Sequence, residues 1–243
     1  DNTVTDTGLR FDDSVPVETL VLSSPELADV PEDKQVLITE KITYRLAQRP
    51  GSYVVLKYVR PVIKRKDTNE LVTPPVPVNV LDKSIADVSF LAGMLVDKFL
   101  YHLPLYRQHQ RLRQCGIEIA RPTLTNLSSR AIDLLEPILD AQFEHILKSR
   151  VLAMDETPIK AGRTAKGTMR QGYIWPLDGD GDDIVFTYKP SRAAGHVRDV
   201  LGESFSGTLV SEGYEAYASF ARHNTLVTHA ECWAHTRRYF ERD

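Results

Sequence analysis

Two acidic residues stand at the ends of short apolar runs, and they are the side chains best placed for chemistry. Val151–Met154 is followed by Asp155, and Thr208–Ser211 is followed by Glu212. A run of about four apolar residues closed by turn formers predicts a buried strand. Carboxylates held at two strand ends favour a divalent metal, because Mg²⁺ prefers oxygen ligands and metal-assisted phosphoryl transfer uses such pairs.

The elements that position these acids alternate along the last part of the chain. We expect strands at 151–154, 172–177, 184–188, 208–211 and 227–230, a helix at 191–201 capped by Ser191, and a helix around 215–222. The acidic segment 178–183 resembles a calcium loop, but Lys189 stands where such a loop needs a glutamate. A hairpin turn is therefore the better interpretation.

The first half of the chain divides by composition. Residues 1–40 hold ten acidic and two basic side chains, whereas 41–70 hold eight basic and two acidic. We expect a flexible acidic lead over 1–33 and a small β module over 34–70, with a turn at Arg49-Pro-Gly-Ser52. A proline-rich linker follows over 71–83. The basic block is compatible either with nucleic acid or with a solvated strand face.

A helical region is expected over 84–150. Ser84 is predicted to open its first helix, with Asp87 as the capping-box acid. Pro104 begins a second helix that Gly116 ends, and a third follows from Arg121. This pattern predicts a helix-turn-helix, with polar side chains that suit phosphates and base edges on the third helix. An ordinary helical hairpin with a polar outer face is the alternative.

Several motifs together resemble one known family, the transposases of the insertion-sequence 66 family. They occur in order from about residue 80 to the end: Leu105-Tyr-Arg-Gln-His109, Thr123-Leu-Thr-Asn126, Met154-Asp-Glu-Thr-Pro158, Tyr173-Ile-Trp-Pro176, Glu212-Gly-Tyr-Glu-Ala-Tyr217 and Cys232-Trp-Ala-His-Thr-Arg-Arg238. The resemblance implies a DDE transposase with a ribonuclease-H-like core, three acidic residues and two Mg²⁺ (or Mn²⁺). The expected fold class is α/β, α+β overall: a β module, a helix-turn-helix region and a truncated ribonuclease-H-like mixed sheet over 151–243.

The resemblance also assigns roles to residues. Asp155 and Glu212 would be catalytic and would hold the metals. DNA, as terminal inverted repeats and target, would be the partner, bound by a homo-oligomer with accessory proteins from the element. The residues expected to contact DNA are Arg121, Thr123, Thr125, Asn126, Arg130, His235, Arg237 and Arg238. The last three would contact DNA phosphate or the edge of the active site.

The sequence departs from the family at Glu212, where the family has aspartate. The added methylene moves the carboxylate by about 1.5 Å, and a misplacement of about 1 Å can cost roughly 10²-fold in rate. The family's third acid, a glutamate, would lie beyond residue 243. Hence a truncated or inactive copy that cleaves nothing by itself is expected. The alternatives are a non-enzymatic DNA-binding protein and a relic too short to fold its sheet.

Other metals and compartments are disfavoured by the remaining pattern. His229, Cys232 and His235 have the spacing of soft ligands, but a structural zinc site wants four ligands in two separated pairs, so zinc is not expected. The module that binds zinc in the family has no cysteines here, because residues 1–114 contain none. Two cysteines and no long apolar run predict a cytoplasmic protein without a membrane span. The resemblance implies a bacterial protein that is associated with the nucleoid.

Overall fold

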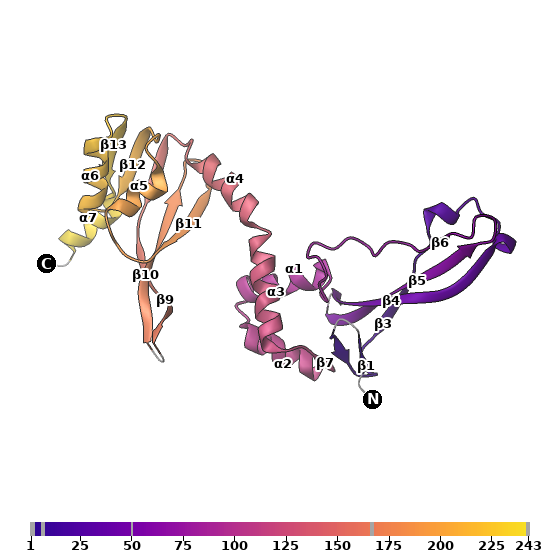
Figure 1. Ribbon diagram of the computed structural model, residues 1–243. Coiled ribbons are helices and arrows are strands. Elements are labelled where there is room, and N and C mark those ends of the chain that lie inside the picture. Colours follow the sequence, from indigo (N-terminus) through magenta and orange to yellow (C-terminus); the bar gives the residue numbers. More distant parts are fainter. Residues whose placement is uncertain (1–2, 6–7, 50, 166–167, 242–243) are drawn as a thin grey trace. The chain divides into compact units, whose positions relative to one another are not determined.

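The computed structural model describes residues 3–5, 8–49, 51–165 and 168–241 of the chain (Figure 1). The backbone divides into two units, 1–135 (unit 1) and 136–243 (unit 2), and each has its own hydrophobic core. Helices and several sheets occur together, which confirms the α+β class. Among the described residues, no helix is both long and apolar enough to cross a membrane.

The β module of unit 1 is the predicted hairpin. β4 (Gln35–Arg49) and β5 (Ser52–Arg65) pair antiparallel from Arg49↔Ser52 to Gln35↔Arg65. Their turn uses Gly51 at φ +78°, a left-handed conformation that glycine adopts without a steric cost. On its other side β5 pairs in parallel with β3 (Val17–Val21), and its far end pairs with β6 (Leu71–Val72).

The described part of the N-terminal lead is built into unit 1, which differs from the flexible lead expected over 1–33. β1 (Thr3–Val4) and β2 (Arg10–Phe11) form a small sheet with β7 (Ile117–Glu118), and two short 3-10 turns, η1 (Pro25–Leu27) and η2 (Glu32–Lys34), precede β4. Leu9 and Phe11 are buried in the same core as the helices. The acidic composition hid these two apolar anchors, and the strand that pairs with β2, β7, is remote in sequence.

Three helices complete unit 1: α1 (Val88–Phe99), α2 (Leu105–Gln114) and α3 (Arg121–Asp133). The first begins later than the predicted Ser84, because Asp87 is its N-cap and accepts a hydrogen bond from the Ser89 N–H. The residues before it extend along β4 instead, where Leu46 N–H donates to the Ile85 carbonyl and Asp87 N–H donates to the Leu46 carbonyl. Gly116 ends α2 at φ +78°, as expected.

The helical region predicted over 84–150 is divided between the two units. α4 (Glu136–Ile146) contacts β11 of unit 2, and Ile146 is fully buried in the core of that unit. The apolar spacing from Leu124 to Ile138 continued across the boundary, so the sequence pattern gave no sign that α4 packs on a different core from α3.

The main sheet of unit 2 has the strand order β11-β10-β8-β12-β13, and β9 pairs with β10 (Figure 1). β8, β10 and β11 pair antiparallel, whereas β8, β12 and β13 pair in parallel. The first and fourth predicted strands, β8 and β12, are therefore neighbours, as expected. The strands are β8 (Val151–Met154), β9 (Thr157–Ala165), β10 (Thr168–Asp178), β11 (Ile184–Lys189), β12 (Gly207–Ser211) and β13 (Val227–Glu231).

Three helices accompany this sheet: α5 (Gly195–Leu201), α6 (Glu215–His223) and α7 (Trp233–Phe240). Trp175, Leu209 and Tyr217 are completely buried between the strands and helices. α5 starts four residues after the predicted cap Ser191, whose hydroxyl instead lies 3.0 Å from His196 Nε2. β9 was not predicted; it and β10 form a two-stranded ribbon that extends beyond the rest of the sheet (Figure 1).

Candidate active site

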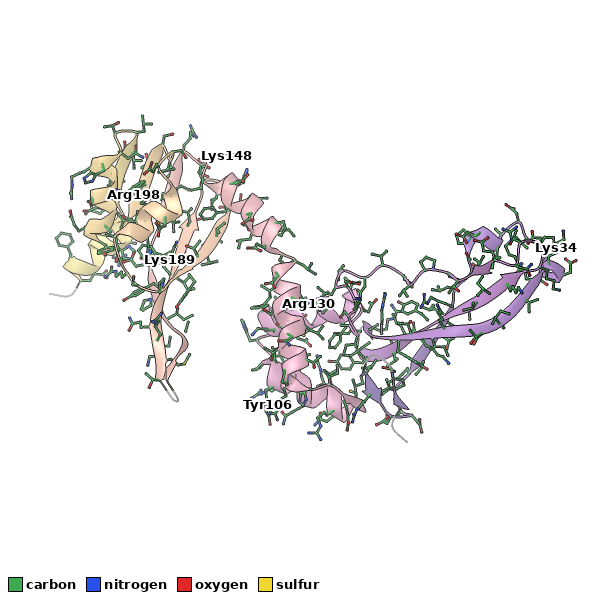
Figure 2. All side chains as sticks on the ribbon, viewed as in Figure 1. Lys34, Tyr106, Arg130, Lys148, Lys189 and Arg198 are labelled. Carbon is green, nitrogen blue, oxygen red and sulfur yellow. The ribbon has the colours of Figure 1, made fainter. Side chains whose placement is uncertain are left out.

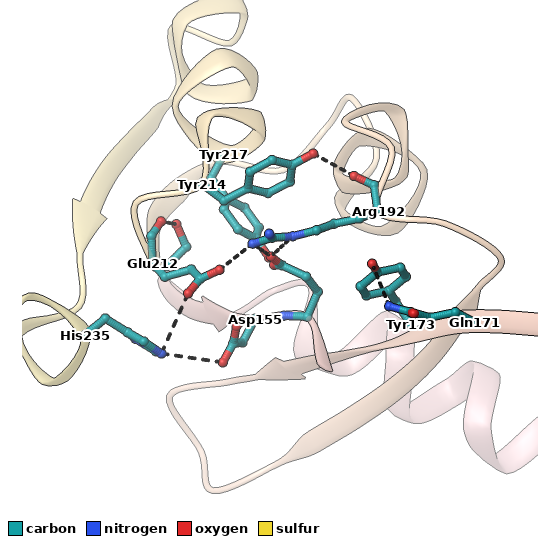
Figure 3. Close-up of polar contacts among 10 residues, drawn as sticks. Asp155, Gln171, Tyr173, Arg192, Glu212, Tyr214, Tyr217 and His235 are labelled. Atoms are coloured by element: carbon teal, nitrogen blue, oxygen red, sulfur yellow. Dashed lines mark hydrogen bonds and ion pairs between the residues drawn. The ribbon is translucent and has the colours of Figure 1, made fainter. Parts of the chain in front are cut away.

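Asp155 and Glu212 come together because their strands are parallel neighbours. Ala153 of β8 pairs with Val210 of β12, and each acid follows its paired residue by two positions. Both acids therefore lie at the same end of this pair of parallel strands. The sequence predicted this juxtaposition across 57 positions, and Figure 3 shows the two side chains approaching one another.

A third potential ligand, His235, comes from the first turn of α7. The Cys232 N–H donates to the Ser211 carbonyl over 2.8 Å, which ties the start of α7 to the end of β12. His235 Nε2 lies 3.8 Å from Asp155 Oδ2 and 4.0 Å from Glu212 Oε2 (Figure 3). One ligand atom from each of the three residues lies within 4.8 Å of the others.

Each carboxylate has one oxygen held by the protein and one directed at the shared space. Asp155 Oδ1 accepts the Glu156 N–H over 2.8 Å, and Glu212 Oε1 accepts from the Arg192 guanidinium over 2.6 Å. The remaining oxygens are those nearest His235. In an octahedral site with ligands at about 2.1 Å, neighbouring ligand atoms are about 3.0 Å apart and opposite ones about 4.2 Å. The donors fit a divalent cation after side-chain adjustments of less than about 1 Å.

Arg192 links the shared space to a buried acid. Its Nε donates to Glu156 Oε1 over 2.6 Å, while its terminal nitrogen reaches both Glu156 and Glu212. The guanidinium lies over the Tyr214 ring at 4.2 Å, and Tyr214 Oη donates to the Arg192 carbonyl over 2.6 Å. The Arg192 guanidinium is thus held between the Glu156 and Glu212 carboxylates.

Glu156, the residue after Asp155, is a buried carboxylate that Arg192 links to Glu212. Its side chain is completely buried, and Tyr217 Oη donates a hydrogen bond to its Oε2. Burial raises the pKa of Glu156 above its ordinary value of 4.5, while the hydrogen bonds from Tyr217 and Arg192 oppose that rise. Burial, followed by the contact with Glu156, raises the pKa of Tyr217, so this phenol stays protonated as a donor.

The predicted DNA-contact residues of α3 are accessible to solvent on unit 1. Arg121, Thr125, Asn126 and Arg130 are exposed and Thr123 is partly exposed. Arg121 lies over the Tyr106 ring at 4.9 Å, and Thr125 Oγ1 donates back to the Arg121 carbonyl over 3.1 Å. Their contact with DNA stays a prediction.

The predicted DNA contacts near the C-terminus lie in different surroundings. His235 faces Asp155 and Glu212 instead of an open surface. Arg237 is exposed and pairs with Glu241, Nε to Oε1 at 2.6 Å. The side chain of Arg238 lies outside the described part of the chain.

The spacing of His229, Cys232 and His235 was the other possible metal pattern in the sequence, and His235 belongs to it as well. His229 Nε2 lies 2.8 Å from Ser211 Oγ, so this ring is engaged with β12. The His235 side chain, then the His235 and Ala234 backbone groups, lower the pKa of the Cys232 thiol.

Sequence reasoning missed Arg192 and Tyr217, whereas it placed His235 either at DNA phosphate or at the active-site edge, and the structure places it beside the two acids. Arg192 belongs to the segment before α5 and has no motif of its own. Tyr217 does belong to the quoted Glu212–Tyr217 motif, and its position five residues after the acid was the available signal. Figure 3 shows how these side chains converge from separate segments.

Comparison with known proteins identifies the family of this chain. The model of the family described as Transposase IS66 family matches residues 83–242. The uncharacterized protein y4jD of Sinorhizobium fredii is 30% identical over 205 residues, which cover 79% of this chain and 40% of that protein. The uncharacterized protein y4qI of the same organism is 26% identical over 230 residues, covering 87% of this chain and 42% of that protein.

The chain spans about two fifths of the length of these curated relatives. The family match includes α1 to α7 and contains Asp155, Glu212 and His235. Because the match extends over more than half of the residues, the chain belongs to the IS66 family of transposases.

Proposed function

We propose that unit 2 carries out metal-dependent cleavage and transfer of DNA strands, and that unit 1 binds the ends of the mobile element. Membership of the family gives the chain a function related to transposition. The observation that carries the catalytic proposal is the meeting of Asp155 and Glu212 at the ends of adjacent parallel strands, with His235 Nε2 within 4.0 Å of both. The strand order β11-β10-β8-β12-β13 agrees with a ribonuclease-H-like sheet.

The contacts of each residue in the site indicate its role. Asp155 Oδ2 and Glu212 Oε2 would hold Mg²⁺ or Mn²⁺, and His235 Nε2 would complete the protein's ligand set. A divalent cation bound there supplies Lewis-acid activation of a water or a DNA 3′-hydroxyl and stabilises the leaving oxygen. The Glu156 N–H orients Asp155, and Arg192 orients Glu212.

Glu212 is expected to limit the rate. Its carboxylate is one methylene longer than the family's aspartate, and Arg192 holds one of its oxygens. Arg192 also neutralises charge that would otherwise attract a cation. The sequence alone predicted no cleavage by this chain. Because Asp155, Glu212 and His235 still come together, we expect weak strand cleavage instead, and a gain when Glu212→Asp shortens the side chain.

A nicking assay tests this function. A supercoiled plasmid with an element end is incubated with the chain in Mg²⁺ or Mn²⁺, and open circles are quantified. We expect slow nicking that Asp155→Asn abolishes and Glu212→Asp accelerates. Asp178→Asn is the matched control, because Asp178 is an exposed acid at the end of β10. Nicking that survives Asp155→Asn would refute the assigned role of Asp155.

The Arg192–Glu212 contact also favours a second candidate, a DNA-binding protein that occupies the ends without cleaving them. In that case no variant nicks DNA, while binding persists. Arg130→Ala should then weaken binding and flatten its salt dependence, and Asp155→Ala should leave binding unchanged.

A further inference from the structure

A cavity in unit 1 brings together cations from four segments of the chain. It has a volume of about 830 Å³ and is open to solvent on one side. Arg10 of β2, Lys83 before α1, Arg113 of α2 and Arg130 of α3 all line it. Among the described residues none of these four forms an ion pair, and Glu118 is the one acidic residue of the lining. The lining therefore carries an excess of positive charge.

The cavity also adjoins the open end of a helix. α3 begins at Arg121, and its N-cap residue Ala120 has no side chain that can accept a hydrogen bond. The Thr123 N–H lies in the first turn, where no intrahelical acceptor exists, and Thr123 lines the cavity. The N-terminal end of a helix attracts anions through such donors and through the helix dipole.

A buried histidine gives an independent indication of a ligand. His109 lines the cavity but is only 8% exposed. Its Nε2 lies 2.9 Å from the Ile119 carbonyl, so that nitrogen is the donor. Its Nδ1 is buried and has no hydrogen-bond partner among the described residues. A buried polar atom without a partner is costly, so this wall of the cavity holds an unsatisfied polar group.

The dimensions favour an extended anion over a single phosphate ion. Thr123, Asn126 and Arg130 line the cavity at helical spacing, so they share one face of α3. At a rise of about 1.5 Å per residue, they span about 10 Å along the helix. Figure 2 labels Arg130 on α3.

We propose that this cavity is a binding site for the sugar-phosphate backbone of DNA, with one phosphate at the N-terminus of α3 and the next towards Arg130. This inference rests on the proposed function, because DNA is the partner it names. It adds Arg10, Lys83, His109 and Arg113 to the DNA-binding surface. Since its donors face phosphates, the site contributes affinity that is independent of base sequence.

The test measures the salt dependence of binding to a fluorescein-labelled duplex of random sequence by anisotropy. For duplex DNA the slope of log K against log salt is about −0.9 per phosphate contact. The double variant Lys83→Gln/Arg113→Gln removes two exposed cavity cations and should make the slope shallower by about 1.8. Lys41→Gln/Arg107→Gln is the matched control, because both cations are exposed on unit 1 outside the cavity. Circular dichroism verifies that both variants are folded.

Each outcome has a definite meaning. A shallower slope in the cavity variant alone supports the site. Equal slopes in the two double variants overturn the site, while the DNA-binding function of unit 1 remains. No binding of any duplex by the native chain refutes that function together with the site. A stabilising effect of inorganic phosphate on thermal unfolding, without duplex binding, would reassign the cavity to a free anion and overturn the DNA-backbone proposal.

Discussion

Replacing Tyr217 by phenylalanine removes one hydroxyl from the interior of unit 2 and changes little else. Tyr217 is fully buried, and its Oη donates to the buried Glu156 carboxylate. A hydrogen bond to a charged group contributes about 1.5–3 kcal/mol, and the acceptor left behind stays buried without that donor. We therefore expect Tyr217→Phe to lower the free energy of unfolding of unit 2 by about 2 kcal/mol at pH 7.

The loss of stability caused by Tyr217→Phe should depend on pH. Burial raises the pKa of Glu156 above 4.5, so this group's contribution to stability is fully present below about pH 4.5 and is lost as pH rises through the folded pKa. The Tyr217 hydroxyl lowers that folded pKa, and removing it raises the pKa further. The difference between Tyr217→Phe and the native chain should consequently be larger at pH 7 than at pH 4.

Urea unfolding followed by the fluorescence of the buried Trp175 measures this difference at both pH values. Tyr188→Phe is the control, because Tyr188 is 47% exposed in the same unit and its replacement should change stability by less than about 0.5 kcal/mol. If Tyr217→Phe costs no more than Tyr188→Phe, or costs more at pH 4 than at pH 7, the account of the buried carboxylate is wrong.

Three further changes test separate parts of the structure. Leu209→Ala removes a fully buried side chain of β12 and should lower the stability of unit 2 by about 2–5 kcal/mol in urea; a loss under about 1 kcal/mol would contradict the assigned core. Gly116→Ala puts a Cβ at φ +78° against the Asp12 carboxylate and should cost more than about 1 kcal/mol in thermal unfolding of unit 1; an unchanged melting temperature would argue against that turn. Glu212→Asp withdraws the carboxylate from Arg192 and should tighten Mg²⁺ binding in calorimetry; weaker binding would show that the longer side chain is the better ligand.

The meeting of Asp155 and Glu212 was predictable because it depends on local patterns and one topological rule. Each acid follows a short apolar run, and a mixed sheet with adjacent first and fourth strands aligns those runs. The hairpin of β4 and β5 was predictable for a similar reason, since its turn residues and alternation are local. Identifying the family from ordered motifs then supplied the partner and the metal as expectations.

Sequence patterns could not predict features that depend on packing between distant segments. Leu9 and Phe11 belong to a core whose other members are mostly remote in sequence, so composition alone suggested a flexible lead. Arg192 has an ordinary sequence context, and its importance comes from the two carboxylates that the fold brings to it. The sequence left His235 either at DNA phosphate or at the active-site edge, because the Cys232–Ser211 hydrogen bond that ties the start of α7 to β12 has no sequence pattern of its own.

Binding of Mn²⁺, followed by electron paramagnetic resonance of the free ion, tests the central claim most directly. The account predicts saturable binding by the chain that Asp155→Asn abolishes and Asp178→Asn leaves intact. Equal Mn²⁺ binding by the native chain and Asp155→Asn, or no binding by the native chain, would contradict a metal site formed by Asp155, Glu212 and His235.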